Sequence, residues 1–279
     1  MNNSTGSFSD LERPPLRPLA LRKALLVPGG LWTELRVVEE TGSTNADVAA
    51  AARGGAAEGL VITAERQTAG RGRLDRQWQS PPRAGLALSV LLRPDVPPAR
   101  LGWLPLLAGV ALAESVRRVA RVDAYLKWPN DLLLQGDRKT AGILAETADG
   151  AVVLGIGLNV TLREHELPRP DATSLALGGA AATDRDPLLR ALLRALADWY
   201  GRFVEHGGDP EASGLRESYV FHCGTIGRRV TVDLPGGAVL TGVATGVDGD
   251  GRLQVTDQAR VMHPVAAGDV VHARLDPTV

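Results

Sequence analysis

The feature that most constrains the fold of this chain is a change in sequence pattern at Cys223. Before it, stretches with apolar residues at helical spacing alternate with short apolar stretches rich in β-branched residues, which indicates helices and strands in one domain. After it, short alternating stretches are separated by "PGG", "DGDG" and "AAGD", a pattern typical of a small SH3-like β-barrel. We therefore predict one domain over residues 32–222 and a second, all-β domain over residues 223–279.

Residues 1–31 have a different composition, rich first in Ser and Asn, then in Pro, and ending with a short Leu-rich piece. This composition predicts a flexible N-terminal arm with at most about one helical turn. The arm is too short and too interrupted by proline for a helix-turn-helix domain, which argues against DNA binding. It also lacks the basic and apolar regions of a secretory signal.

Local patterns in residues 32–222 predict individual elements. Thr44 is a candidate helix cap with Asp47 three residues later, and Gly54 and Gly55 end the alanine-rich helix that follows. Strands are expected at 59–65 and 84–94, a hairpin with its turn at 149–150, and helices at 99–120, 186–206 and 209–220.

Composition excludes several classes of function. The chain has 31 Lys and Arg against 32 Asp and Glu, and this balance argues against general nucleic-acid binding. A single cysteine, Cys223, allows no internal disulfide, and the five histidines show no zinc-type spacing. No apolar run of eighteen residues is present, so we expect no membrane span and a cytoplasmic location.

The most unusual stretch is the basic loop "TAERQTAGRGRLDRQWQS" over residues 63–80. Gly70 and Gly72 allow the backbone to approach a ligand closely, while Arg71 and Arg73 present guanidinium groups suited to phosphate or carboxylate. A dinucleotide-binding fingerprint would need a third small residue opening a helix, and a Walker A loop would need GK[ST]; neither is present. The loop is therefore either a solvated surface loop or, as we expect, the lid of an anion site.

Three further stretches carry chemistry. "KWPND" groups Lys127, Asn130 and Asp131 around a turn fixed by proline, and "RKTAGIL" puts Lys139 at the start of an apolar strand, where it should point into a partly buried place. "GIGLNV" (155–160) has two glycines inside a buried strand, which indicates close approach of backbone or ligand.

Taken in order, with "STN" upstream, these motifs closely resemble the biotin protein ligases over residues 36–275. The resemblance implies the α+β fold class, with a mixed sheet flanked by helices as in class II synthetase-like biotin/lipoate ligase domains, and an SH3-like C-terminal barrel. It implies an ATP-dependent, Mg²⁺-assisted enzyme that forms biotinyl-5′-AMP and transfers biotin to a lysine of a biotin carboxyl carrier domain of acetyl-CoA carboxylase or a related carboxylase. Without a DNA-binding domain ahead of it, the chain resembles the monofunctional type.

The resemblance also implies roles for individual residues. Lys139, Arg73 and Asp131 are implied to be catalytic. The biotin site is implied to comprise Ser43, Thr44, Asn45, Gln67, Arg71, Gly72, Arg73, Lys139, Gly155 and Gly157. Nucleotide binding falls to Arg76, Trp78, Asn130 and Asn159, and Mg²⁺ binding to Asn130 and Asp131.

One residue departs from the family pattern, and two other functions stay open. Asp75 stands where the family usually has glycine, which adds a negative charge beside the phosphate site. The alternatives are a lipoate-type protein ligase and a non-catalytic, biotin-binding regulator. We expect biotin, ATP and a carrier domain as partners, no DNA and no membrane, and a monomer or weak homodimer.

Overall fold

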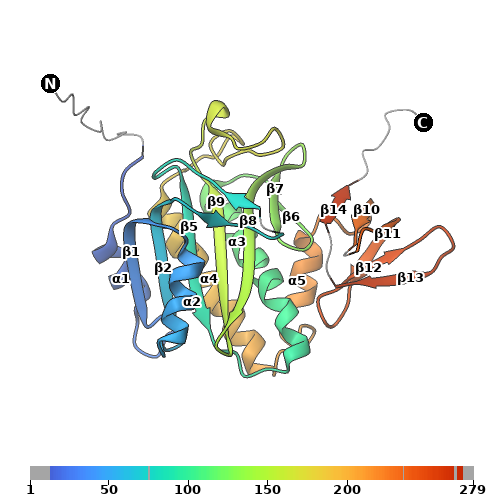
Figure 1. The fold of residues 1–279 in the computed structure, drawn as a ribbon, viewed down its shortest axis with the longest axis horizontal. Coiled ribbons are helices and arrows are strands. Elements are labelled where there is room, and N and C mark those ends of the chain that lie inside the picture. The colour runs from blue at the N-terminus through green and yellow to red at the C-terminus, as the bar shows by residue number, and fades with distance from the viewer. Residues whose placement is uncertain (1–12, 75, 235, 267–268, 273–279) are drawn as a thin grey trace.

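The computed structural model describes residues 13–74, 76–234, 236–266 and 269–272. Its larger part is built on a seven-stranded sheet in the order β1-β2-β5-β9-β8-β7-β6 (Figure 1). β1 and β2 are parallel and the other neighbouring strands are antiparallel, so the sheet is mixed, as expected. The strands are β1 (Glu34–Thr41), β2 (Leu60–Gln67), β5 (Gly85–Leu92), β6 (Tyr125–Lys127), β7 (Asp131–Leu134), β8 (Arg138–Ala148) and β9 (Ala151–Asn159).

Helices cover both faces of this sheet (Figure 1). They are α1 (Pro18–Leu25), α2 (Thr44–Arg53), α3 (Trp103–Ala120), α4 (Arg185–Glu205) and α5 (Leu215–His222), with short 3₁₀ helices η1 (Pro98–Gly102) and η2 (Glu164–Glu166). The strand period of two sorts the side chains: on β2, Leu60 and Ile62 pack with α2, whereas Val61 joins the larger core that contains α3 and α4. The two faces thus hold two separate apolar clusters.

The C-terminal part forms a five-stranded antiparallel sheet in the order β13-β12-β11-β10-β14. Its strands are β10 (Arg229–Asp233), β11 (Val239–Val247), β12 (Leu253–Thr256), β13 (Met262–Val265) and β14 (Asp269–His272). Alternate residues such as Val230, Val232 and Val255 are fully buried inside it. This architecture agrees with the small β-barrel predicted from the sequence.

The prediction of a flexible arm over residues 1–31 is wrong for residues 13–31. Leu16 and the α1 residues Leu21 and Leu25 are buried in the main core, and α1 packs against β1 and α4. The prolines were interpreted as helix breakers, but Pro18 occupies the first turn of α1, where its missing N–H costs nothing. Residues 1–12 lie outside the described residues.

The start of α2 also differs from the sequence prediction. Ser43, not Thr44, is the N-cap residue, and Thr44 is the first residue of the helix. The Asp47 carboxylate accepts a hydrogen bond from the Thr41 hydroxyl at 2.6 Å. Thr44 therefore does not act as the cap, and its hydroxyl contacts Gln67 and Ser89 instead.

Helix α5 is shorter than the sequence predicts. The helix expected over 209–220 begins later, at Leu215, after Gly214, which has a left-handed backbone conformation.

Among the described residues, the stretch Pro98–Ala120 is long and apolar enough to cross a membrane by length and composition. However, 67% of its apolar window is buried inside the protein, and its position between the sheet and α4 accounts for its apolar character.

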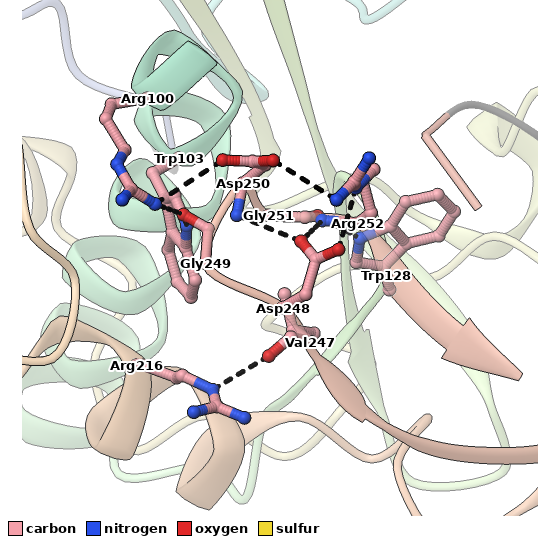
Figure 2. Close-up of polar contacts among 10 residues, drawn as sticks. All are labelled: Arg100, Trp103, Trp128, Arg216, Val247, Asp248, Gly249, Asp250, Gly251 and Arg252. Carbon is pink, nitrogen blue, oxygen red and sulfur yellow. Dashed lines mark hydrogen bonds and ion pairs between the residues drawn. The ribbon is translucent and has the colours of Figure 1, made fainter. Parts of the chain in front are cut away.

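The C-terminal sheet is attached to the larger domain through the β11–β12 turn, residues 248–252 (Figure 2). Two buried tryptophans of the larger domain donate indole hydrogen bonds to this turn: Trp103 to the Gly249 carbonyl at 2.9 Å and Trp128 to the Gly251 carbonyl at 3.0 Å. Arg216 donates to the carbonyl of Val247 at 2.7 Å. The two domains are therefore joined by directed hydrogen bonds as well as by apolar packing.

Candidate active site

The residues that the family resemblance assigned to biotin, nucleotide and catalysis all line one cavity of about 760 Å³. They are Ser43, Thr44, Asn45, Gln67, Arg71, Gly72, Arg73, Arg76, Trp78, Asn130, Asp131, Lys139, Gly155, Gly157 and Asn159. The C-terminal domain closes one side of the cavity with Asp233, Val270 and Val271. Residues far apart in sequence are thus brought together, while their individual roles stay predictions.

The basic loop is a small hairpin, which we call the basic hairpin (residues 68–84). It contains β3 (Gly70–Arg71) paired antiparallel with β4 (Gln77–Trp78). A Cβ atom on Gly70 would lie 2.5 Å from the carbonyl oxygen of Trp78, so glycine is required at this close approach. The tip turns through Leu74, whose φ is +54°. Asp75 lies outside the described residues, so its predicted effect on the phosphate site stays untested.

The arginines of the basic hairpin reach across to the strands that form the cavity. Arg71 lies 3.2 Å from a carboxylate oxygen of Glu146 on β8, and Arg73 donates to the side-chain oxygen of Asn130 at 3.2 Å. The Arg71 side chain is 50% exposed, so its ion pair is screened by water and contributes little to stability. Such a guanidinium is available to an incoming phosphate or carboxylate.

A hydrogen-bonded network at the start of α2 forms the polar wall of the cavity. The backbone N–H and the hydroxyl of Thr44 donate to the Gln67 side-chain oxygen at 2.8 and 3.1 Å. Ser89 on β5 contacts the Thr44 hydroxyl at 2.7 Å and donates to the Asn45 side-chain oxygen at 2.6 Å. Asn45 in turn donates to Glu146 at 2.7 Å. The network fixes amide and hydroxyl groups suited to a polar ring such as a ureido group.

Gly155 and Gly157 allow other groups to reach β9. A Cβ atom on Gly155 would lie 2.1 Å from the side-chain oxygen of Asn45, and one on Gly157 would lie 2.4 Å from the indole of Trp78. Both distances are shorter than any real Cβ contact, so a side chain at either position would displace its neighbour. The sequence interpretation of these glycines as points of close approach is therefore consistent with the structure.

Lys139 and Asp131 form the central ion pair of the cavity. They lie near the ends of the antiparallel strands β8 and β7, and the Lys139 ammonium is 2.5 Å from an Asp131 carboxylate oxygen. Their side chains are 21% and 17% exposed, so the pair is only partly hydrated. Among the described residues this buried oxygen has no hydrogen-bond donor besides that ammonium. Lys139 therefore lies in a partly buried place and lines the cavity, as expected for a lysine at the start of an apolar strand.

The oxygens of Asn130 and Asp131 are the candidate Mg²⁺ ligands. Within the described residues, no group of three or more His, Cys, Asp and Glu side chains could hold a metal ion. A single carboxylate beside an amide oxygen fits Mg²⁺ only in the form in which substrate phosphates and water supply most ligands. The donor set therefore fits a nucleotide-bound Mg²⁺ and not a metal held by the protein alone.

Some residues of the cavity were not found from the sequence. The segment after η2 contributes Pro168, Arg169 and Asp171, and Asp171 accepts from the backbone N–H of Lys139 at 2.7 Å through its carbonyl. Nothing in "LPRPDAT" signals this role. Ser89 and Glu146, which support Asn45, were also missed, because they lie inside ordinary strand patterns.

The mixed sheet, the attached β-barrel and a cavity with an arginine hairpin facing a lysine define a protein of the biotin/lipoate ligase class. Residues 41–162 match the family described as "Biotin/lipoate A/B protein ligase family", and residues 225–273 match "Biotin protein ligase C terminal domain". Biotin–[acetyl-CoA-carboxylase] ligase of Mycobacterium tuberculosis is 46% identical over 271 residues, which is 95% of this chain and 98% of that protein. The chain belongs to the biotin protein ligase family.

Other relatives and solved structures agree with this assignment. The bifunctional ligase/repressor BirA of Escherichia coli is 35% identical over 218 residues, covering 76% of this chain and 66% of that protein. The structure described as biotin protein ligase from Aquifex aeolicus in complex with biotin and ATP has a TM-score of 0.71 and 26% identity. The comparison covers 88% of this chain and all of that one.

Proposed function

We propose that the chain is a biotin–[biotin carboxyl carrier protein] ligase that condenses biotin with ATP to biotinyl-5′-AMP. It then transfers biotin to a lysine of a carrier domain of acetyl-CoA carboxylase or a related carboxylase. The observation that carries the proposal is the convergence of the Lys139–Asp131 pair, the arginines of the basic hairpin and the polar wall of α2 on one cavity. The Aquifex aeolicus relative, described in complex with biotin and ATP, supports both substrates.

The first step has to overcome charge repulsion. A biotin carboxylate must attack the α-phosphate of ATP, and two like charges about 4 Å apart repel by about 4 kcal/mol at an effective dielectric constant of 20. Lys139 supplies a fixed positive charge between the two groups, and Arg71 and Arg73 add charge from the basic hairpin. These cations offset the repulsion and stabilise the charge that develops at phosphorus.

Mg²⁺ would neutralise charge on the phosphates when bound with the nucleotide, and Asn130 and Asp131 are the residues that would hold it. Pyrophosphate then leaves, and the mixed anhydride stays under the basic hairpin. The hairpin has to exclude water, because hydrolysis would waste the activated acyl group.

The second step needs a neutral amine. The acceptor lysine of the carrier loses a proton before it attacks the biotinyl carbonyl, and AMP is the leaving group. Asp131 is the carboxylate of the cavity suited to orient that amine or to accept its proton. Asp131 is paired with Lys139, so the ammonium has to turn toward the phosphate for Asp131 to become available.

The test of this function is ATP–pyrophosphate exchange with and without biotin, followed by transfer of biotin to a purified carrier domain. Biotin-dependent exchange and stable biotinylation of one carrier lysine are expected. A lipoate-type ligase would show exchange with lipoate that biotin does not suppress. A non-catalytic regulator would bind biotin without releasing pyrophosphate.

The setting of the reaction follows from its substrates. ATP and carboxylase carriers point to the cytoplasm, and the proposed activity requires neither DNA nor a membrane. We infer a monomer or a weak homodimer as the working state, which sedimentation velocity at micromolar concentration would test, and a gel shift at physiological salt would test DNA binding.

A further inference from the structure

Residues 13–17, which we call the N-terminal strap, contact both loops that border the reaction cavity. The strap does not line the cavity itself. Arg13 and Leu16 are nevertheless only 6% and 4% exposed, so the strap is built into the protein and is not a surface tail.

The first of these loops is the basic hairpin, and one buried arginine holds both of its ends. The hairpin leaves β2 just after Gln67 and rejoins the sheet at Gly85. Arg185, at the start of α4, lies 2.5 Å from a carboxylate oxygen of Glu65 on β2 and donates to the Gly85 carbonyl at 3.2 Å. The Arg185 and Glu65 side chains are 4% and 7% exposed, so this ion pair is shielded from water.

The strap completes the coordination of that buried pair. The Pro14 carbonyl accepts a hydrogen bond from Arg185 at 2.6 Å, and the backbone N–H of Leu16 donates to the second carboxylate oxygen of Glu65 at 2.6 Å. The strap therefore supplies one of the hydrogen bonds that compensate each charged partner for its burial. The position of both ends of the basic hairpin therefore depends on the strap.

The second loop follows η2, and Arg13 holds it. Arg13 donates to both carboxylate oxygens of Glu166 at 3.1 and 2.5 Å and to the Thr161 carbonyl at 2.8 Å. The hydrogen bond from Arg13 is the largest cause that lowers the pKa of Glu166. Directly after Glu166 the chain forms the cavity wall with Pro168, Arg169 and Asp171, and Asp171 contacts Lys139 through the backbone.

We propose that the N-terminal strap is a positioning element for the two loops that border the cavity. It fixes the base of the basic hairpin through the backbone of Pro14 and Leu16, and the base of the loop after η2 through Arg13. Arg13 is the side chain that anchors the strap, so its loss also loosens Pro14 and Leu16. The proposal rests on the proposed function, because its consequence is retention of the adenylate. When these two loops are fixed at their bases, they move away from the cavity less often. Escape of the adenylate depends on the fraction of time that the loops leave the cavity open.

Arg13→Ala tests the proposal, with Arg17→Ala as the matched control. Arg17 lies on the same strap, but its side chain is 61% exposed and pairs with Asp184 and Asp186, not with Arg185, Glu65 or Glu166. Its backbone N–H, which also donates to Asp186, is kept in Arg17→Ala.

The measurement is the release of labelled biotinyl-AMP formed in the active site, timed after addition of excess unlabelled substrates. Biotinylation of added albumin, which is not a carrier, reports the released adenylate. We expect Arg13→Ala to release the adenylate at least tenfold faster than the wild type, with single-turnover adenylate synthesis within threefold of the wild type. Arg17→Ala should behave as the wild type. Equal release from Arg13→Ala and wild type, or equal acceleration by Arg17→Ala, would overturn the proposal.

A second measurement separates this proposal from the proposed function. Hydrogen exchange of the unliganded proteins should rise over residues 68–84 and 161–172 in Arg13→Ala and not in Arg17→Ala. This result needs no catalytic activity, so a wild type that makes no adenylate would refute the function while leaving the exchange test valid. If Arg13→Ala does not fold, the double exchange Arg13→Glu with Glu166→Arg should restore slow adenylate release relative to Glu166→Arg alone, and failure to restore it would count against the strap.

Discussion

The indole of Trp78 lies across Gly157, and it does so at the cross-strand pair that Gly157 forms with Gly142. The basic hairpin therefore rests on a patch of bare backbone on β8 and β9. A Cβ atom on Gly157 would be 2.4 Å from the indole, whereas one on Gly142 would be 3.5 Å away, an ordinary contact. The two glycines share a place in the sheet but differ in how much room the hairpin leaves them.

This difference predicts unequal effects of two similar substitutions. Gly157→Ala should push Trp78 off the sheet and lower kcat/KM for biotin by at least about tenfold, or about 1.4 kcal/mol. Gly142→Ala should change it by less than about threefold, because its methyl group meets no atom closer than 3.4 Å. Steady-state kinetics on both variants test this, and comparable losses would show that glycine is needed there for another reason.

Arg73 is predicted to retain the intermediate more than to make it. Its contact with Asn130 joins the basic hairpin to the turn that precedes β7. In Arg73→Gly, pyrophosphate exchange should remain measurable while biotinyl-AMP leaks and bystander lysines become biotinylated. Mass spectrometry of an added non-carrier protein measures the leak. Equal losses in both half-reactions without leakage would contradict this role.

Lys139 is predicted to be essential for the first step. Lys139→Ala removes the fixed cation and leaves the Asp131 carboxylate next to the phosphate site without its partner. Losing one such electrostatic contact should lower the rate of adenylate formation by at least about 10²-fold. ATP–pyrophosphate exchange is the direct measurement, and near-normal exchange would refute the assignment. Transfer from chemically supplied biotinyl-AMP should be much less affected, which separates the two steps.

The residues chosen from the motifs line one cavity, and they could be chosen because each motif is a continuous stretch of chain whose chemistry is visible locally. "KWPND" and "RKTAGIL" put Asp131 by a turn and Lys139 at the start of a strand, and in the structure the two residues lie on neighbouring strands with their side chains in contact. The pairing of Arg185 with Glu65 spans 120 positions and has no local pattern, so no sequence rule could have found it. The same holds for Arg13 with Glu166.

The fold was predicted from local patterns in the same way, and the prediction failed where structure depends on contacts between distant segments. The mixed sheet and the C-terminal barrel follow from periodicity, whereas α1 was missed. Its Leu21 and Leu25 are four residues apart on one helix face, but the face is informative only once the core that it covers is known. Residues that owe their structure to tertiary contacts are the ones that local patterns leave out.

The attachment of the C-terminal domain predicts a difference between two tryptophans (Figure 2). Trp128→Phe should destabilise the protein by about 1–3 kcal/mol, because the partly buried Gly251 carbonyl loses its indole donor. Trp103→Phe should cost less, because the Gly249 carbonyl keeps a second donor in Arg100. Urea unfolding of both variants measures this, and an equal loss would indicate that packing of the rings outweighs the hydrogen bonds.

The last prediction concerns acid stability and Glu166. Its hydrogen bonds with Arg13 hold the pKa of Glu166 below the ordinary value of 4.5, so the unfolded chain binds more protons than the folded one as pH falls through that range. Its contribution to stability is therefore fully present above pH 4.5 and is lost as pH falls toward the lowered pKa. Other carboxylates such as Asp248 and Asp257 also have lowered pKa values, so acid should destabilise every variant to some extent.

The experiment compares wild type with Glu166→Gln. The quantity to measure is the difference between the two proteins in the free energy of unfolding, obtained by urea titration from pH 7 to pH 3.5. That difference should be constant above about pH 5 and should shrink below it, because a protonated Glu166 resembles glutamine. A difference that stays the same at every pH would mean that the Glu166 charge does not hold Arg13 and its strap in place.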